Sequence, residues 1–378
     1  MAGNGAPDSW QVLSIGSMLD AIIDYRGKTP PKSQNGIPCL SAANVKGGKI
    51  DLSSVTYVSQ ETYDRWTTRG FPEPGDVLIT TEAPVGEVAS FPGDRTYLMT
   101  RRVMALRGKE GVLDNDFLKY VLLSPEAFER LARIARGTTA PRVLKTDITD
   151  LEIPVPPFPE QNAIAAVLGA LDDKIELNRR MNATLEAMAR ALFQSWFVDF
   201  DPVRAKLDGR QPVGIDSSIA ALFPDSFQDS EVGHIPKGWH LGRLSDLCNL
   251  KRGHDLPSSS LTAGPIPVIS SSGISGSHSE TNIRGPGVVT GRYGTIGKVF
   301  YVESDYWPLN TTLYVDDFKA NPPRFVFHVL GEVSFQDYTD KAAVPGVNRS
   351  PRPLQWCNSL GLSPGYAGAE RAHLGHLA

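Results

Sequence analysis

The sequence predicts an α+β protein in which two similar mixed modules are separated by a long coiled-coil-type helix. The chain has 378 residues, more than one ordinary domain needs. Two stretches about 211 residues apart share the same order of strand, glycine-containing loop and return strand, which indicates an internal repeat. Between them, a segment without proline carries apolar residues in steps of four and three, which is typical of a coiled-coil helix.

The repeat consists of three matches in the same order. Residues 75–88, GDVLITTEAPVGEV, match residues 287–299, GVVTGRYGTIGKV. The other two matches pair residues 36–41 with 264–270 and residues 140–143 with 344–347. Each copy is therefore predicted to contain short strands, turn-rich loops and a helix near its end. In the first copy this helix is expected from about Asp116 to Arg136.

The long helix is predicted from Glu160 to Phe197, because the proline-rich stretch before Glu160 forbids a helix and no proline follows until Pro202. Such a helix would be about 57 Å long. Asn178 and Asn182 interrupt its stripe, where they either fix the register of a facing helix or face solvent. The predicted subunit-docking seam consists of Ile164, Leu168, Leu171, Ile175, Leu185, Leu192 and Trp196.

Composition predicts a soluble, cytoplasmic protein. Apolar residues make up 41%, no apolar run reaches the roughly 18 residues of a membrane span, and the N-terminus does not resemble a secretory signal. Cys39, Cys248 and Cys357 lie far apart, and the histidines show no metal-ligand spacing. We therefore expect reduced cysteines and no metal site.

Charge indicates where a nucleic acid could bind. The net charge of −4 is not that of a wholly basic binder, so any DNA affinity must come from local patches. Residues 130–145 hold five positive side chains and no acidic one, and the pair Arg101-Arg102 adds two more. A solvated helix face is the alternative explanation for this run.

Three further stretches resemble the DNA-specificity subunit of type I restriction–modification systems. Residues 151–161, LEIPVPPFPEQ, are similar to the segment that closes a target-recognition domain and opens a conserved helix in that family. Residues 195–206, SWFVDFDPVRAK, resemble the end of that helix, and residues 229–239, DSEVGHIPKGW, resemble the lead-in to the second domain. The resemblance spans residues 10–349.

The resemblance implies a division of the chain into five parts. These are a first target-recognition domain (1–158), a central long helix (159–200), a linker (201–240), a second target-recognition domain that is incomplete at its end (241–349) and an atypical tail (350–378).

The resemblance also implies a function without catalysis. Each domain would read one half of a bipartite site, and the helix length limits the separation of the two to roughly 17 base pairs. The helices would dock methyltransferase subunits and, through them, motor–nuclease subunits. No cofactor is expected on this chain, because S-adenosylmethionine, ATP and Mg²⁺ belong to those partners.

Candidate DNA contacts lie in the loops of both modules. In the 287–299 hairpin, glycines would let the backbone approach a groove, while Arg292, Tyr293 and Lys298 would contact phosphate, sugar or base. A tight structural hairpin is the alternative. Around residues 137–139, phosphate contacts are expected from Arg136, Thr138, Arg142 and Lys145. Weaker candidates for DNA contacts, chosen because they are polar loop residues of the two modules, are Lys28, Asn44, Arg101, Arg102 and Arg252. Simple solvation is the alternative explanation for them.

Two rival functions remain open from the sequence, an enzyme and an assembly scaffold with decayed recognition domains. Residues 321–324, Asn-Pro-Pro-Arg, approach the motif with which adenine methyltransferases hold a flipped base, but arginine replaces the aromatic residue. Residues 291–298 lack the spacing and the helix of a phosphate-binding P-loop. Neither stretch therefore predicts catalysis.

The tail differs from the rest of the chain. Residues 350–378 contain three charged residues, seven glycines or prolines and no heptad stripe. We expect this stretch to be poorly ordered and the family's second conserved helix to be missing. The protein would then be either a defective remnant or a homodimer whose two copies pair their seams, as shortened members of the family are thought to do.

Overall fold

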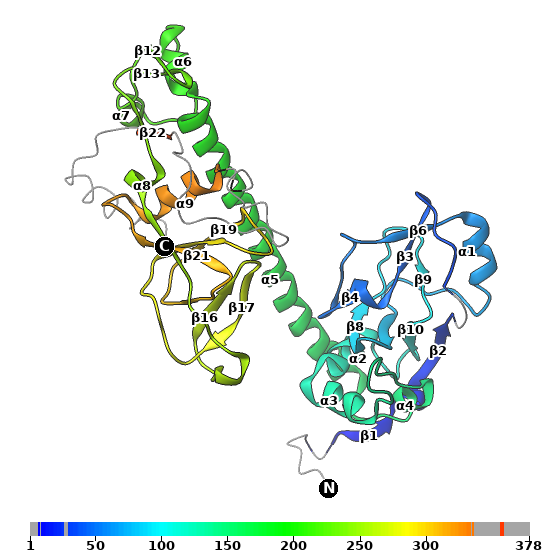
Figure 1. The fold of residues 1–378 in the computed structure, drawn as a ribbon. Coiled ribbons are helices and arrows are strands. Elements are labelled where there is room, and N and C mark those ends of the chain that lie inside the picture. The colour runs from blue at the N-terminus through cyan, green and yellow to red at the C-terminus, as the bar shows by residue number, and fades with distance from the viewer. Residues whose placement is uncertain (1–6, 8, 26–28, 334, 336–355, 359–378) are drawn as a thin grey trace. The chain divides into compact units, whose positions relative to one another are not determined.

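The computed structural model describes residue 7 and residues 9–25, 29–333, 335 and 356–358 (Figure 1). The chain divides into two compact units, Met1–Met181 and Asn182–Ala378. The boundary falls inside the long helix α5 (Phe158–Phe193), which therefore contributes residues to both units.

Unit 1 is built on two small sheets. The first has four antiparallel strands in the order β2 (Leu19–Asp24), β10 (Val103–Gly108), β7 (Val77–Thr81) and β8 (Val85–Ser90). The second has the order β6 (Thr56–Val58), β3 (Ile37–Leu40) and β9 (Leu98–Met99), with β9 parallel to β3. The smaller pairs are β1 (Gln11–Ser14) with β11 (Glu152–Val155) and β4 (Val45–Lys46) with β5 (Lys49–Ile50).

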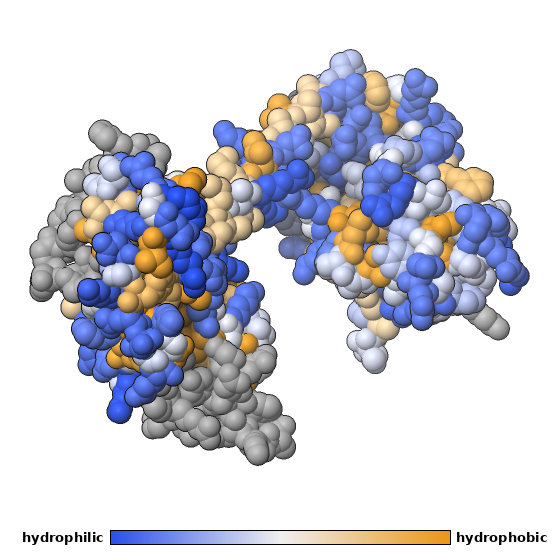
Figure 2. Space-filling model, turned by 90° about the horizontal axis from the view of Figure 1, so that it is seen from above, coloured by the Kyte–Doolittle hydropathy of each residue, from blue (hydrophilic) through white to orange (hydrophobic). Residues whose placement is uncertain are grey.

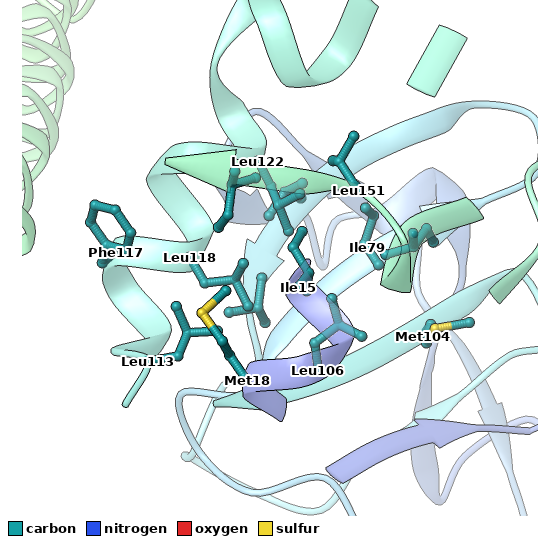
Figure 3. Close-up of a cluster of buried hydrophobic side chains, with 14 of the residues drawn as sticks. Ile15, Met18, Ile79, Met104, Leu106, Leu113, Phe117, Leu118, Leu122 and Leu151 are labelled. Atoms are coloured by element: carbon teal, nitrogen blue, oxygen red, sulfur yellow. The ribbon is translucent and has the colours of Figure 1, made fainter. Parts of the chain in front are cut away.

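The four-stranded sheet separates two hydrophobic cores. Because side chains alternate along a strand, Ile79 joins the core on one face and Leu78 joins the core on the other. The first core packs the sheet against helices, and Figure 3 shows Leu118 of a helix close to Ile15 and Leu106. The second core fills the space toward the three-stranded sheet. Both faces of the sheet are therefore covered.

The helix expected from Asp116 to Arg136 is in fact two helices, α2 (Asn115–Leu123) and α3 (Pro125–Ile134). Pro125 cannot continue α2, because it has no N–H to donate. Ser124 between them is extended and its hydroxyl accepts a hydrogen bond from the Ala127 N–H at 3.2 Å, which caps α3. The shorter helices of unit 1 are η1 (Ile15–Met18), η2 (Ala42–Asn44), α1 (Gln60–Trp66) and α4 (Lys145–Thr149).

Unit 2 repeats the sheets of unit 1. Its four-stranded sheet has the order β15 (Asn249–Arg252), β21 (Thr312–Asp317), β18 (Gly287–Gly291) and β19 (Val299–Val302). Its three-stranded sheet has the order β17 (Gly273–His278), β16 (Ile266–Ser270) and β20 (Trp307–Pro308), with β20 parallel to β16. The predicted internal repeat is confirmed for the described residues; residues 344–347, the last match, lie outside them.

The repeat extends to the strand pair that closes each unit. In unit 1, Leu13 of β1 pairs with Ile153 of β11. In unit 2, β14 (His240–Gly242) pairs antiparallel with β22 (Trp356–Asn358), and Leu241 pairs with Cys357. Three residues of the stretch expected to be poorly ordered thus form a strand at the position equivalent to β11. The other residues of 350–378 lie outside the described residues.

The segment that the sequence suggested as a linker, 201–240, is folded. It contains α6 (Asp201–Leu207), α7 (Ser217–Ala220), β12 (Phe227–Ser230) and β13 (Gly233–Pro236). Val203, Phe223, Ile235 and Trp239 are buried in a core of their own. The remaining helices of unit 2 are a π-helical turn (Gln194–Val198), α8 (Leu244–Leu247), η4 (Ser258–Ser260) and α9 (Pro323–Gly331).

The first turn of α5 is fixed to unit 1 by one buried amide. Gln161 is 1% exposed. Its Oε1 accepts a hydrogen bond from the Asp114 N–H at 2.9 Å, and its Nε2 donates to the carbonyl oxygens of Val112 at 2.9 Å and Pro156 at 3.0 Å. The side chain thereby joins the loop before α2, the exit of β11 and the helix. Gln161 lies inside the proline-rich motif, but no local pattern in the sequence indicates this role.

We expect Gln161→Ala to loosen this junction, because it leaves one donor and two acceptors without their partner, and a buried unsatisfied group costs about 1–3 kcal/mol. Hydrogen exchange of the full chain should show faster exchange in peptides that cover residues 112–117. Asn162→Ala, a change at the exposed neighbouring residue, is the control and should leave exchange there unaltered. Equal exchange in the two variants would show that Gln161 does not hold the helix.

Candidate nucleic-acid interface

In unit 1, the loop that leaves the basic run folds back on itself. Arg136 and Arg142 exchange two backbone hydrogen bonds, with N–O distances of 2.8 and 3.0 Å, and so close the loop of residues 137–141. All five residues of this loop are exposed, including Thr138. The bridge therefore presents a short exposed loop with an arginine at each end.

This loop lies against the turn between β7 and β8. The Val143 N–H donates to the Thr81 carbonyl at 2.9 Å, and the Ala83 N–H donates to the Pro141 carbonyl at 3.2 Å. The Thr81 N–H donates in turn to the Arg102 carbonyl at 2.9 Å. Residues 81–83, 101–102 and 136–145 thus meet at one end of the sheet, and we call them the first loop edge.

Carboxylates neutralise some of the cations at the first loop edge. Arg136 donates two hydrogen bonds to Asp147, at 2.9 and 3.1 Å, and Arg102 pairs with Glu82 at 3.1 Å. Arg101 and Arg142 are exposed and Lys145 is half-buried, and none of these three forms an ion pair with another described residue. These three cations are therefore the ones available to an anionic ligand.

In unit 2, two other segments contact the loop that precedes β21. On one side, the N–H groups of Arg292 and Tyr293 donate to the Thr311 carbonyl at 2.9 and 3.1 Å. On the other side, the His254 N–H donates to the Pro308 carbonyl at 2.7 Å. Residues 252–255, 291–298 and 308–312 thus meet at one end of the sheet, and we call them the second loop edge.

The hairpin within the second loop edge requires a glycine. A Cβ on Gly291 would lie 1.8 Å from the carbonyl oxygen of Thr295, so no larger residue fits. The Gly291 N–H donates to the Lys298 carbonyl at 3.3 Å, which places exposed Lys298 at the base of the hairpin. Its ammonium lies 5.1 Å from the centre of the Phe300 ring.

The two loop edges occupy the same position in the repeat. In unit 1, Asp24 of β2 and Ile79 of β7 both pair with Met104 of β10. In unit 2, the residues at these positions are Arg252 of β15 and Thr290 of β18, which both pair with Leu313 of β21. The structure therefore brings together, at equivalent ends of two sheets, most of the residues that the sequence singled out.

One predicted contact residue is not part of these edges. Asn44 is 2% exposed; its Oδ1 accepts hydrogen bonds from the N–H and hydroxyl of Ser41, and its Nδ2 donates to the Asp51 carbonyl at 2.8 Å. Its amide thus fixes its own loop and is not available for DNA. Lys28 lies outside the described residues. Sequence reasoning missed His254 and Thr311, because no local pattern distinguishes them from other loop residues.

The seam of α5 changes its surroundings along the helix. Ile164 packs against the first core of unit 1, and Leu168 is half-buried. Trp196 differs from the prediction, because it packs inside unit 2 against Phe197 and Phe223. The seam residues that remain exposed are Leu171 (54%), Ile175 (47%), Leu185 (55%) and Leu192 (45%). Figure 2 shows apolar residues, in orange and tan, on the surface of this stretch of helix.

Beyond Ile164, it is a neighbouring face of α5 that contacts unit 1. The Tyr120 hydroxyl donates to the Asp172 carboxylate at 2.9 Å, and Lys49 pairs with Glu176 one helical turn further on. Burial, followed by this hydrogen bond to Asp172, raises the pKa of Tyr120, so the phenol remains a donor. The apolar stripe therefore remains exposed although α5 makes these contacts with unit 1.

The Asn-Pro-Pro-Arg stretch has a structural role. The Asn321 side-chain amide donates to the carbonyl oxygens of Leu247 at 2.9 Å and Phe318 at 3.1 Å, just before α9 begins. Arg324 pairs with Glu303 at 2.6 Å and lies over the Tyr301 ring. These contacts indicate that the stretch fixes the start of α9 and does not form a pocket for a flipped base.

The described residues contain no group of three or more His, Cys, Asp or Glu side chains that could hold a metal ion. Burial raises the pKa of the Cys39 thiol to about 11 and that of Cys248 to about 12, so both thiols are protonated at neutral pH. None of the described helices is both long enough and apolar enough to span a membrane.

Comparison with known proteins gives the family. A family model described as the type I restriction modification DNA specificity domain matches residues 7–187 and 236–337. The chain is 30% identical over 200 residues to the specificity subunit of the type I restriction enzyme MjaIX from Methanocaldococcus jannaschii, a match that covers 53% of this chain and 41% of that protein. It is 40% identical over 192 residues to the HindI specificity subunit from Haemophilus influenzae, covering 40% and 42%.

The matched regions thus span less than half the length of these two relatives. Among solved structures, the chain is similar to the S subunit of a type I restriction–modification system from M. genitalium, with 16% identity, a TM-score of 0.48 and coverage of 99% of this chain and 91% of that one. The family model matches parts of both units, and the chain therefore belongs to the family of type I restriction–modification DNA-specificity domains.

Proposed function

We propose that this chain is the non-catalytic subunit that determines the DNA sequence at which a type I restriction–modification system acts. Each unit reads one half of a bipartite site through its loop edge, and partner subunits carry out methylation and cleavage. The observation that carries this proposal is the repeat: the same sheet order places arginine-bearing loops at equivalent ends of both units, and the family model matches both.

The composition of the edges suits two kinds of DNA contact. Exposed cations such as Arg101 and Arg142, with the Thr138 hydroxyl in the loop, suit phosphate contacts that set position. In unit 2, Arg292 and Tyr293 are half-buried and held by the Thr311 carbonyl, which suits contacts to bases. The first loop edge thus supplies candidates for contacts to the DNA backbone, and the second loop edge supplies candidates for contacts to bases.

The alternative is a truncated or defective subunit that serves mainly as an assembly scaffold. The family model matches residues in both units, which does not favour decayed recognition domains. Selection of bound fragments from a random duplex library, with the chain and its methyltransferase, separates the two functions. A recognition subunit should enrich two short fixed sequences separated by a gap of constant length; enrichment of no sequence would leave only the scaffold.

The exposed stripe on α5 is proposed as the docking surface for other helices. Leu171, Ile175 and Leu185 would pack against the methyltransferase or against the same stripe of a second copy of this chain. Exposed Asn178 and Asn182 would fix the register of that pairing. S-adenosylmethionine, ATP and Mg²⁺ are assigned to the partner subunits.

The first loop edge predicts the salt dependence of DNA binding. Arg142→Ala combined with Lys145→Ala removes two cations that form no ion pair with other described residues. The slope of log K against log salt concentration should become shallower by about 0.9 for each phosphate that is no longer neutralised. Fluorescence anisotropy with a labelled duplex between about 50 and 200 mM salt measures it.

Arg65→Ala combined with Lys109→Ala is the matched control, because it removes the same charge from exposed positions outside the edge. Its slope should equal that of the unaltered chain. If both double variants shift the slope equally, the effect comes from net charge, and the first loop edge is not the contact surface.

The stripe on α5 predicts which variants fail to assemble. Leu171→Asp combined with Leu185→Asp places two charges in the proposed interface, where burying them without a partner is strongly unfavourable. The variant should neither co-purify with the methyltransferase nor form a dimer by light scattering, while hydrogen exchange in the two sheets stays unaltered.

The control is Ala166→Asp combined with Ala187→Asp, which adds the same charge at exposed positions of α5 off the stripe. This chain should assemble as the unaltered one does. Normal assembly of the Leu171/Leu185 variant would rule out the stripe as the docking surface.

A further inference from the structure

Buried polar atoms without partners are concentrated in unit 2. Among the described residues, seven buried side-chain nitrogen or oxygen atoms lack a hydrogen bond, and all seven belong to this unit. A buried unsatisfied group costs about 1–3 kcal/mol, so such a concentration needs an explanation. The atoms are Arg252 Nε, His254 Nε2, Thr290 Oγ1, Arg292 Nε, Tyr306 Oη, Trp307 Nε1 and Thr311 Oγ1.

Four of these residues lie in the second loop edge, and Thr290 adjoins it. Arg252 and Thr290 pair with Leu313 from opposite sides of β21, so their side chains emerge on the same face of the sheet. Arg292 follows two residues after Thr290, and its N–H is bonded to the Thr311 carbonyl. The unpartnered groups are therefore neighbours at the end of one sheet.

The chemistry of the cluster favours a ligand rich in hydrogen-bond acceptors. The two guanidinium groups only donate, whereas the Thr311 hydroxyl can donate or accept. Arg252 is 3.7 Å from Asp255, a long contact to an exposed carboxylate, and Arg292 forms no ion pair with another described residue. Both arginines are half-buried, and the Nε of each is shielded from water and has no hydrogen-bond partner.

The Arg292 guanidinium also lies over an aromatic ring. Its guanidinium carbon lies 4.4 Å from the centre of the Tyr293 ring. Stacking on an aromatic face preorganises the planar fork, which matches two acceptors side by side. A phosphate contact needs only a charge at the surface, as Lys298 provides in the same hairpin, but a guanine edge with O6 and N7 needs the fork.

The fold itself does not require these groups. The positions in unit 1 that are equivalent to Arg252 and Thr290 carry Asp24 and Ile79. Asp24 pairs with Arg69 at 3.1 Å, and Ile79 belongs to the first core. The polar groups at Arg252 and Thr290 are therefore properties of the second unit rather than of the shared architecture.

We propose that the second loop edge reads guanine, with Arg292 donating two hydrogen bonds to O6 and N7 of one guanine in the half-site of unit 2. Arg252 lies beside it as a second donor to the same stretch of bases. This inference rests on the proposed function and specifies a base for one half of the site.

Mapping of methylated positions in cells that carry the chain and its methyltransferase tests the proposal. Arg292→Lys keeps the charge but removes the fork. The preference for guanine at one position of one half-site should fall by about tenfold or more, while the other half-site is read as before. Arg284→Lys, a matched change at an exposed arginine of unit 2 outside the second loop edge, should leave that guanine preference intact.

Other outcomes overturn the proposal. An unchanged motif with less methylation at every site would make Arg292 a phosphate contact, and an unchanged motif with unchanged methylation would remove it from the interface. A motif of the unaltered chain without guanine in either half would also contradict it. If the unaltered chain directs no methylation, the proposed function itself fails. Circular dichroism of Arg292→Lys, and the parallel variant Arg252→Lys, show whether the absence of a motif reflects misfolding.

Discussion

The antiparallel pairing of one central strand with two neighbours determines where the functional loops of each unit lie. β10 is antiparallel to both β2 and β7, so these two strands run parallel and end at the same side of the sheet. β21 imposes the same arrangement on β15 and β18. Loops that follow these strands are therefore brought together however far apart they lie in the sequence. A single topology, used twice, produces two edges whose side chains can differ, and Arg252 in place of Asp24 is one such difference.

The long helix has two distinct faces over its first turns. Gln161 and Asp172 fix one face to unit 1 through hydrogen bonds, while Leu171 and Ile175 on the neighbouring face stay exposed. Exposed leucine and isoleucine side chains in a coiled-coil spacing are unfavourable in water unless another helix covers them. The hydrogen bonds within the chain thus fix which face of the helix lies against unit 1. The exposed stripe is the reason to expect a second helix as a partner.

Local patterns predicted the repeated hairpins and the long helix, because strand alternation, proline positions and the spacing of apolar residues are encoded over short stretches. They did not predict the helix break at Ser124, where a capping hydroxyl and a proline act together. They also failed where a role depends on distant residues. Asn44 resembles a surface polar residue in the sequence, but its own loop encloses it, and His254 and Thr311 join the second loop edge only through backbone pairing between segments far apart in the chain.

If the two loop edges are the DNA-reading surfaces, as we propose, hydrogen exchange with and without a selected duplex should detect the contact in both. Exchange should slow with DNA in both edges, at residues 81–83 and 137–145 in unit 1 and at residues 252–255, 291–298 and 308–312 in unit 2. Exchange in α1, which contributes no residue to either edge, should not change. Protection of α1 or of the α5 stripe with both edges unaltered would contradict the claim.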